Sequence, residues 1–207
     1  MNIYQYEINL RKKGYKYICG TDEVGRGPMA GPLVAAAVVL PEDFHIEGLN
    51  DSKKLTSKKR EELYQEILKH AIEVQVSYID VDTVDKLNVY WASKLAMTNC
   101  IKKMKIKPDY ILSDAMKLDV DIPCLDLING DAQSASIAAA SIVAKVSRDH
   151  YMIEMDKLYP EYGFKNHKGY CTKGHLEALD KYGVCKIHRK SFAPVKRYLS
   201  KQLTLNI

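Results

Sequence analysis

The chain has 207 residues, of which 46% are hydrophobic, and its net charge is +5 at pH 7. This length and composition suit one sizeable core, exclude a disordered chain, and leave no apolar run long enough to cross a bilayer. The polar N-terminus does not resemble a secretory signal, and the five scattered cysteines lack a C-x-x-C pair, so we expect a cytoplasmic protein without disulfide or zinc sites.

Short apolar runs predict strands in the first two thirds of the chain. They are rich in Val, alternate with polar residues, or are bounded by proline, as buried or half-exposed strands are. The predicted strands cover residues 15–22, 31–41, 72–79, 108–114 and 122–128.

Helical periodicity predicts helices between and after these strands, at residues 57–71, 82–104, 134–160 and 171–183. Ser57 is a plausible N-cap for the first of them, and Gly183 stops the last. In the second, an apolar stripe is formed by Leu87, Trp91, Leu95 and Thr98.

This order of elements predicts an α/β protein with one mixed central β-sheet flanked by helices. We expect a single domain over residues 1–207, with an N-terminal extension (1–16), a basic helical C-terminal lobe (157–207) and a tail (200–207). The lobe has a net charge of +8, against −3 for the remainder, and interleaves aromatic residues and three histidines. This composition suits a nucleic-acid backbone, although a plain solvated surface would look the same.

Acidic residues stand at the ends of three apolar runs. Asp22 is expected to end the first strand and Glu23 to begin the turn after it, Asp114 ends "YILSD", and Asp131 follows "LDLING". If these strands are neighbours, the carboxylates converge and repel one another. Mg²⁺ or Mn²⁺ would resolve this, and two such ions about 3.5–4 Å apart can clamp a phosphodiester displacement.

Each acid also has an ordinary structural alternative. Acidic residues at strand ends often cap helices or form turns, as Asp131 could before its helix, and Asp51 reads as a loop residue. The three residues Gly25, Arg26 and Gly27 form a loop that could direct N–H groups at a sugar or phosphate, and Arg26 adds a phosphate partner. The same tripeptide also occurs in tight turns.

Together these blocks closely resemble the ribonuclease HII family, the type 2 ribonucleases H. The resemblance rests on "GTDEVGRGPMAGP", "DSKKLT", "YILSDAM", "NGDAQSASIAAASIVAKVSRD" and "YPEYGFKNHKGYCTKGH" with "HRKSFAPV", in the family's order from about residue 17 to residue 195.

The resemblance implies an RNase H-like fold with a helical C-terminal part. It implies cleavage of the RNA strand of RNA–DNA hybrids, incision 5′ of single ribonucleotides in duplex DNA, and 3′-hydroxyl and 5′-phosphate products. The family's metal-binding acids fall on Asp22, Glu23, Asp114 and Asp131, its G-R-G loop on Gly25 to Gly27, and its junction-sensing tyrosine on Tyr170 in "HKGY". A core position is the alternative for that tyrosine.

Four cations are candidates for phosphate contacts, with surface or packing roles as the alternatives: Lys53, Lys145, Lys168 and Arg189. Asn129 departs from the lysine that the family commonly has before Asp131, and Asp149 in "SRDH" could serve a structural salt bridge or cap. In the tail, Gln202-Leu203-Thr204-Leu205 looks like the peptides that dock in bacterial sliding clamps, although most short tails are frayed.

Two rival functions stay open. A ribonuclease HIII-like enzyme would usually carry an N-terminal sheet domain, for which about 16 residues before the first strand leave no room, and it would lack the "HKGY" tyrosine. A nucleic-acid binding module without catalysis would need the basic lobe and none of the four acids. We expect a monomer by default, and no membrane partner.

Overall fold

The computed structural model describes residues 2–43, 45–49 and 52–205, without the side chains of Lys53 and residues 201–205. Asp51 therefore lies outside the described residues. The elements, in chain order, are α1 (Gln5–Lys12), β1 (Ile18–Val24), β2 (Leu33–Val39), η1 (Ser52–Lys54), α2 (Ser57–His70), β3 (Glu73–Ile79), α3 (Val81–Lys103), β4 (Tyr110–Asp114), β5 (Cys124–Leu127), η2 (Gly130–Ala132), α4 (Ala135–Leu158), η3 (Pro160–Tyr162), α5 (Phe164–His167), α6 (Lys173–Tyr182) and α7 (Ala193–Leu205).

Backbone contacts divide the described chain into two compact units. The sheet unit comprises residues up to 24, 34–78 and 93–147, and the helical unit comprises 25–33, 79–92 and 148 onward. Both α3 and α4 contribute residues to each unit. The organisation as a single domain stays a prediction.

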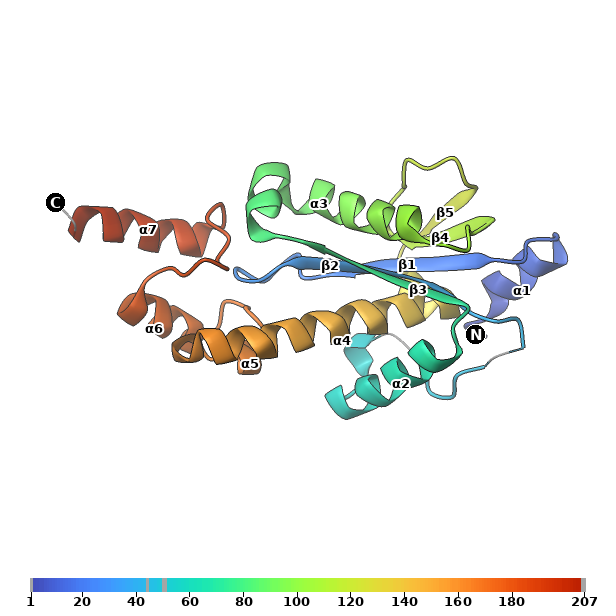
Figure 1. The fold of residues 1–207 in the computed structure, drawn as a ribbon, viewed down its shortest axis with the longest axis horizontal. Coiled ribbons are helices and arrows are strands. Elements are labelled where there is room, and N and C mark those ends of the chain that lie inside the picture. Colours follow the sequence, from blue (N-terminus) through green and yellow to red (C-terminus); the bar gives the residue numbers. More distant parts are fainter. Residues whose placement is uncertain (1, 44, 50–51, 206–207) are drawn as a thin grey trace. The chain divides into compact units, whose positions relative to one another are not determined.

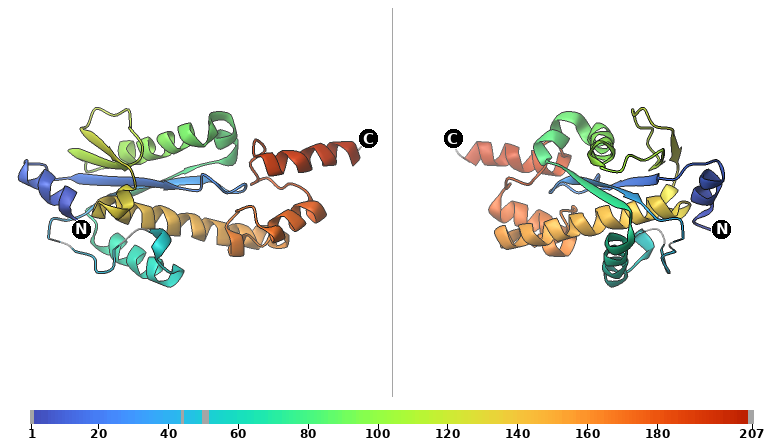
Figure 2. Two further views of the ribbon diagram at one scale, coloured as in Figure 1. Left: turned by 180° about the vertical axis from the view of Figure 1, so that it is seen from behind. Right: turned by 45° about the vertical axis from the view of Figure 1, so that its right-hand side comes forward.

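In the sheet unit, the described strands form a mixed sheet in the order β3-β2-β1-β4-β5, as the sequence predicts. β1 runs antiparallel to β2 and parallel to β4, and β4 runs parallel to β5. Within this unit, Figures 1 and 2 show residues 93–103 of α3 on one face of the sheet, and α2 with residues 135–147 of α4 on the other. This arrangement places the C-terminal ends of β1 and β4 side by side.

Small residues allow α4 to pack directly on β1. A Cβ atom at Gly20 would lie 2.0 Å from the carbonyl carbon of Ser136, so the strand and helix backbones are in contact. The buried Ala138, Ala139 and Ile142 of α4 continue this packing in a core shared with α2. The small-residue character read from the sequence is therefore explained by close packing.

The N-terminal extension contains a helix that the apolar pattern does not reveal. α1 buries Leu10, and its Glu7 is 1% exposed. The Glu7 carboxylate accepts hydrogen bonds from the Ser134 hydroxyl (2.6 Å) and the Ser136 amide (2.9 Å). A buried carboxylate thus holds the N-terminal end of α4, where the helix dipole favours negative charge.

Two local predictions are wrong. The N-cap of α2 is Thr56, whose hydroxyl accepts from the Lys59 amide at 3.2 Å, rather than Ser57. In α3, the side chains of Leu87, Trp91 and Leu95 are 37%, 52% and 37% exposed, so the apolar stripe does not face the core. Asn88 (φ 64°, ψ 169°) interrupts α3 and breaks the helical period on which the stripe was based.

The core of the helical unit explains much of the aromatic content of the C-terminal lobe. Tyr162 and Phe164 are buried and stacked, with ring centroids 5.2 Å apart, and His175 and His188 are buried beside them. These side chains therefore do not form a nucleic-acid surface. Of the aromatic residues in this lobe, Tyr170 and Tyr182 are exposed, at 44% and 48%. No helix in the described part of the chain is long and apolar enough to span a membrane.

Candidate active site

Asp22 and Asp114 stand at equivalent places on neighbouring parallel strands. Thr21 of β1 pairs with Ser113 of β4, and the next residue of each strand is the aspartate. Adjacent strands lie about 4.8 Å apart, so the two carboxylates meet on one edge of the sheet. Glu23 follows Asp22 within β1, which continues to Val24 rather than ending at Asp22.

The environment of Asp22 disfavours its negative charge. Burial raises the pKa of this carboxyl well above its usual range, and the charges of Glu23 and Asp114 raise it further. Hydrogen bonds from Ser141 and from the Glu23 amide, the latter at 2.7 Å, lower the pKa and only partly offset this. Asp22 is 5% exposed, so water does little to hydrate its carboxylate or to screen the repulsion from the neighbouring acids.

Asp131 lies in a turn that a hydrogen bond ties to the end of β4. It is 3% exposed and lies in η2. The amide of the preceding Gly130 donates to Asp114 Oδ1 at 2.7 Å, which fixes this turn to the end of β4. Asn129 begins the turn in the left-handed region (φ 55°, ψ 46°), a conformation that asparagine adopts more readily than lysine or most other residues. We refer to Asp22, Glu23, Asp114 and Asp131 as the acid cluster.

The chemistry of the acid cluster suits hard divalent cations. Its donors are carboxylate oxygens, the ligands that Mg²⁺ and Mn²⁺ prefer. A cation would also offset the repulsion that raises the pKa of Asp22. Within the described residues, no three His, Cys, Asp or Glu side chains form a ready-made cage for a metal ion. The acid cluster therefore fits such a cation by the chemistry of its donors, and not by a preformed coordination geometry among the described residues.

The Gly25–Gly27 loop belongs to the helical unit, and its backbone requires glycine at position 25. Gly25 has φ +95°, and a Cβ atom there would lie 2.5 Å from Arg148 Nε. Arg26 and Gly27 are exposed. The Cβ position of Gly27 lies 3.6 Å from Cε1 of Tyr170, so the loop and the exposed tyrosine ring are neighbours.

Two buried arginines hold this loop through its carbonyl groups. Arg148 donates to the carbonyl oxygens of Pro32 (2.9 Å), Ala30 (3.0 Å) and Lys168 (2.9 Å). Arg148 therefore links the segment that follows this loop to the segment before Tyr170. We call Gly25–Gly27, Tyr170, Arg148 and Arg189 the loop–tyrosine assembly.

Arg189, predicted from the sequence as a phosphate contact, is 0% exposed. Its Nη2 donates to the Gly31 carbonyl at 2.9 Å and its Nη1 to the Arg26 carbonyl at 3.2 Å. Burial, together with the charge of Arg148, lowers the pKa of Arg189 to about 9. This geometry favours a role in positioning the loop, and the phosphate contact stays a prediction.

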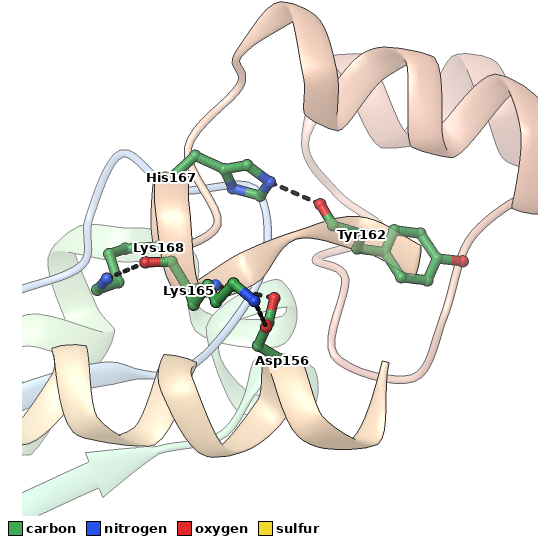
Figure 3. Close-up of polar contacts among 5 residues, drawn as sticks. All are labelled: Asp156, Tyr162, Lys165, His167 and Lys168. Carbon is green, nitrogen blue, oxygen red and sulfur yellow. Dashed lines mark hydrogen bonds and ion pairs between the residues drawn. The ribbon is translucent and has the colours of Figure 1, made fainter. Parts of the chain in front are cut away.

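Lys168 lies in a tightly bonded turn shown in Figure 3. Its backbone is left-handed (φ 51°), and its Nζ donates to the Lys165 carbonyl oxygen. The Lys165 amide and ammonium groups bond to Asp156 at 3.1 and 3.3 Å. His167 Nε2 bonds to the Tyr162 carbonyl at 2.9 Å. These bonds give the segment leading to Tyr170 a defined conformation.

The remaining predicted contacts are less informative. Lys145 is half-buried on α4 in the sheet unit, and the side chain of Lys53 lies outside the description. Asp149 is half-buried and its charge acts on Arg148, as a structural salt-bridge role would require.

The sequence analysis missed two residues that hold the predicted site residues in place. Ser141 bonds to Asp22 and, at 2.9 Å, to Ser52. Arg148 supports the loop–tyrosine assembly. The sequence does contain a signal for Arg148, which follows the run "SIVAKV" in the predicted helix 134–160. An arginine in the interior needs several hydrogen-bond acceptors, so this position indicates a structural role.

Comparison with known proteins identifies the family. A family model described as ribonuclease HII matches residues 19–195. Ribonuclease HII of Bacillus mycoides (strain KBAB4) is 55% identical over 197 residues, covering 95% of this chain and 77% of the relative. The chain belongs to the ribonuclease HII family. It is accordingly an endonuclease that acts on RNA–DNA hybrids, and enzymes of this family depend on metal ions.

Solved structures agree on the fold of this ribonuclease HII chain. The ribonuclease H2 from Pyrococcus horikoshii OT3 superposes with a TM-score of 0.76 at 25% identity, covering 89% of this chain and 97% of the other. The ribonuclease HII in a PCNA:RNase HII complex from Archaeoglobus fulgidus gives a TM-score of 0.72 at 24% identity, covering 84% and 93%. The predicted RNase H-like fold is therefore confirmed.

Proposed function

We propose that the enzyme incises duplex DNA 5′ of single embedded ribonucleotides, in addition to cleaving the RNA strand of hybrids. The observation that carries this proposal is the meeting of Asp22 and Asp114 on parallel strands, with the pKa of Asp22 raised by burial and by the neighbouring acids. Asp22, Glu23, Asp114 and Asp131 would hold two ions of Mg²⁺ or Mn²⁺. Such ions supply an activated water and neutralise charge on the departing oxygen.

The chain's own residues would position the substrate for hydrolysis. Water oxygen bonds to the phosphorus 5′ of the ribonucleotide as the bond to the upstream 3′-oxygen breaks. The departing oxygen takes a proton, which leaves a 3′-hydroxyl and a 5′-phosphate. Burial keeps bulk water from screening the charges of Asp22 and Asp131.

Choice of RNA over DNA requires reading the 2′-hydroxyl, which both donates and accepts hydrogen bonds. In our proposal, the backbone of Gly25–Gly27 reads this group, because loop glycines allow close approach. The exposed Tyr170 ring packs on the next sugar when that sugar lacks a 2′-hydroxyl. Lys53, Lys145 and Lys168 are proposed as phosphate contacts.

Product mapping tests the reaction. A duplex with one ribonucleotide, labelled at its 5′ end, is expected to yield one product ending in a 3′-hydroxyl immediately upstream of the ribonucleotide, with Mg²⁺ and not with EDTA. A ribonuclease HIII-like enzyme would cut this duplex poorly. Efficient cutting of an all-DNA duplex, or cutting on the 3′ side, would contradict the proposal.

Asp22→Asn separates catalysis from binding. We expect the variant to lose cleavage while it retains affinity for the hybrid, since the loop–tyrosine assembly is intact. Glu66→Gln on α2, an exposed acid outside the acid cluster, serves as the matched control. Normal cleavage by Asp22→Asn with Mg²⁺ would remove the catalytic assignment.

For the remaining features, we propose a monomer that behaves as one domain, and docking of Gln202–Leu205 in a sliding clamp. The archaeal homologue solved with PCNA supports only the general idea of a clamp partner. Sedimentation tests the monomer. A pull-down against the clamp, with and without residues 200–207, tests the tail, and equal failure of both forms would exclude docking.

A further inference from the structure

Two buried histidines form a hydrogen-bond chain that ends on the backbone of Tyr170. His175 of α6 is 0% exposed and His188 is 1% exposed. Their Nε2 atoms lie 3.0 Å apart. His175 Nδ1 lies 2.9 Å from the Tyr170 carbonyl oxygen, and the Cys185 amide donates to His188 Nδ1 at 3.1 Å. The chain therefore runs from Cys185 through both imidazoles to Tyr170.

The chemistry of the two ends fixes the proton positions in this chain. A carbonyl oxygen only accepts, so His175 carries its proton on Nδ1. A backbone amide only donates, so Nδ1 of His188 is bare and its proton lies on Nε2. His188 Nε2–H then donates to the bare Nε2 of His175. The Cys185 carbonyl lies farther from His188 Nδ1, at 3.4 Å, and the shorter amide contact determines the tautomer.

Both rings are neutral at physiological pH. Burial, together with the charge of His167, lowers the pKa of each imidazole to about 4. His167 stacks on His175 with ring centroids 4.3 Å apart, and Tyr162 and Phe164 pack on both rings of the pair. The Cys185 thiol, 3.1 Å from His188 Nδ1, keeps its proton because burial raises its pKa to about 11. No group facing the pair is a carboxylate among the contacts described.

The other end of the chain is tied to the segment that follows Gly25–Gly27. His188 forms an antiparallel backbone bridge with Ala30. On either side of it, the Gly31 amide donates to the Ile187 carbonyl (2.8 Å) and the Arg189 amide to the Met29 carbonyl (2.9 Å). The imidazole pair thus spans from the loop segment to the residue proposed to sense the junction.

We infer that His175 and His188 are positioning residues for Tyr170, which set the preference for a ribonucleotide-to-deoxyribonucleotide junction by fixing the backbone of that tyrosine relative to the Gly25–Gly27 loop. Tyr170 is 44% exposed, and its backbone also bonds to the His167 carbonyl and the Thr172 amide, each at 2.9 Å. His175 adds a side-chain donor to the Tyr170 carbonyl and thereby connects it to His188. This inference rests on the proposed role of Tyr170.

The test compares kcat/KM for a duplex with one ribonucleotide with kcat/KM for a uniform RNA–DNA hybrid. Their ratio measures junction preference. His175→Leu removes the donor to Tyr170 and is expected to lower the ratio about tenfold, with cleavage of the hybrid nearly unchanged. His175→Asn places an amide donor near the former Nδ1 and is expected to restore most of the ratio. His70→Leu on α2 is the matched control and is expected to leave the ratio unchanged.

A purely structural role would lower both activities together in His175→Leu, and that result would overturn the inference. Equal ratios for the Leu and Asn variants would do so as well. Tyr170→Ala is measured in parallel. If Tyr170→Ala keeps the wild-type ratio, the proposed role of Tyr170 fails; if it lowers the ratio while folded His175→Leu does not, only the inference fails.

Nitrogen NMR of the wild-type protein provides a measurement that does not depend on variants folding. At pH 7 we expect the proton of His175 on Nδ1 and that of His188 on Nε2. The opposite tautomer at His175, or a charged ring at either position, would overturn the inference.

Discussion

The acid cluster and the loop–tyrosine assembly differ in how their polar groups are stabilised. In the acid cluster, buried like charges raise the pKa of Asp22, so the local arrangement opposes folding in the absence of a cation. In the loop–tyrosine assembly, Arg148 donates to three carbonyl oxygens and Arg189 to two. The acid cluster therefore lowers the stability of the fold at the site proposed for catalysis. The loop–tyrosine assembly, in contrast, keeps its conformation through stabilising hydrogen bonds.

The strongest test of this contrast is Asp114→Asn. The amide oxygen can still accept from Gly130, but one charge beside Asp22 is lost. We expect cleavage to fall at least about 1000-fold, or about 4 kcal/mol. In EDTA the free energy of unfolding should rise by about 1 kcal/mol, because the repulsion on Asp22 is relieved. Urea denaturation measures this, and a decrease in stability would contradict the contrast.

Arg148→Met should have the opposite effect on stability. Three carbonyl oxygens lose their donor inside the helical unit, so the free energy of unfolding should fall by about 3 kcal/mol. Arg148→Lys keeps the charge but cannot reach all three acceptors, and it should recover only part of the loss. Urea unfolding followed by tyrosine fluorescence checks both variants. Unchanged stability in Arg148→Met would show that these bonds do not support the loop.

Acid should destabilise the helical unit through His175 and His188. The pKa of each imidazole is about 4 in the folded protein and about 6.5 when unfolded, so unfolding takes up protons between these values. Their contribution to stability is complete above about pH 6.5 and is lost as the pH falls towards 4. We expect each of the two imidazoles to lower the stability by about 2 kcal/mol at pH 5 relative to pH 7.

The contribution of Asp22 to stability depends on pH in the opposite direction. Its raised pKa means that protonation favours the folded state, and this contribution is lost as the pH rises through the folded-state pKa.

His188→Gln tests the prediction for the two histidines. It removes one of the two imidazoles, so the loss of stability in acid, measured by thermal unfolding, should be smaller than in the wild-type protein. An equally steep profile in that variant would assign the acid sensitivity to other groups.

The smallest expected effect is at Asn129. Its left-handed backbone tolerates glycine, so Asn129→Gly should change stability by less than about 0.5 kcal/mol. Asn129→Ala should cost about 1 kcal/mol, because a Cβ without a polar partner disfavours this conformation. Thermal unfolding distinguishes the two. Equal stability of the Ala and Gly variants would show that the turn before Asp131 relaxes without cost.

The sequence predicted the strands of the sheet because the apolar runs are short and clearly bounded, although β1 continues past Asp22 to Val24. The acids at the ends of these runs followed from the same pattern, and their pairing across β1 and β4 needed only neighbouring parallel strands. α1 was missed because its helical face carries Glu7, a buried acid that periodicity counts as polar. The stripe of α3 was misplaced because Asn88 interrupts the helix, a backbone event that apolar spacing does not encode.

The residues that hold the loop–tyrosine assembly in place could not be predicted from the sequence, for a different reason. Arg148 and His175 act on carbonyl oxygens, which every residue possesses, so no partner residue type reveals the contact. The sequence left a phosphate contact, a surface role and a packing role open for Arg189, since buried arginines without a carboxylate partner are uncommon. Only the folded backbone shows which acceptors converge on these side chains.

Because the Gly130 amide donates to the Asp114 carboxylate, its NMR signal should respond to changes at the acid cluster. Its proton chemical shift depends on the electron density at the accepting oxygen, and it sits one residue before Asp131 in the chain. Titration of the acids, or occupancy by a cation, should therefore displace this single resonance while most of the spectrum stays in place. The enzyme carries, within its own backbone, a label for following events at the carboxylates without any added probe.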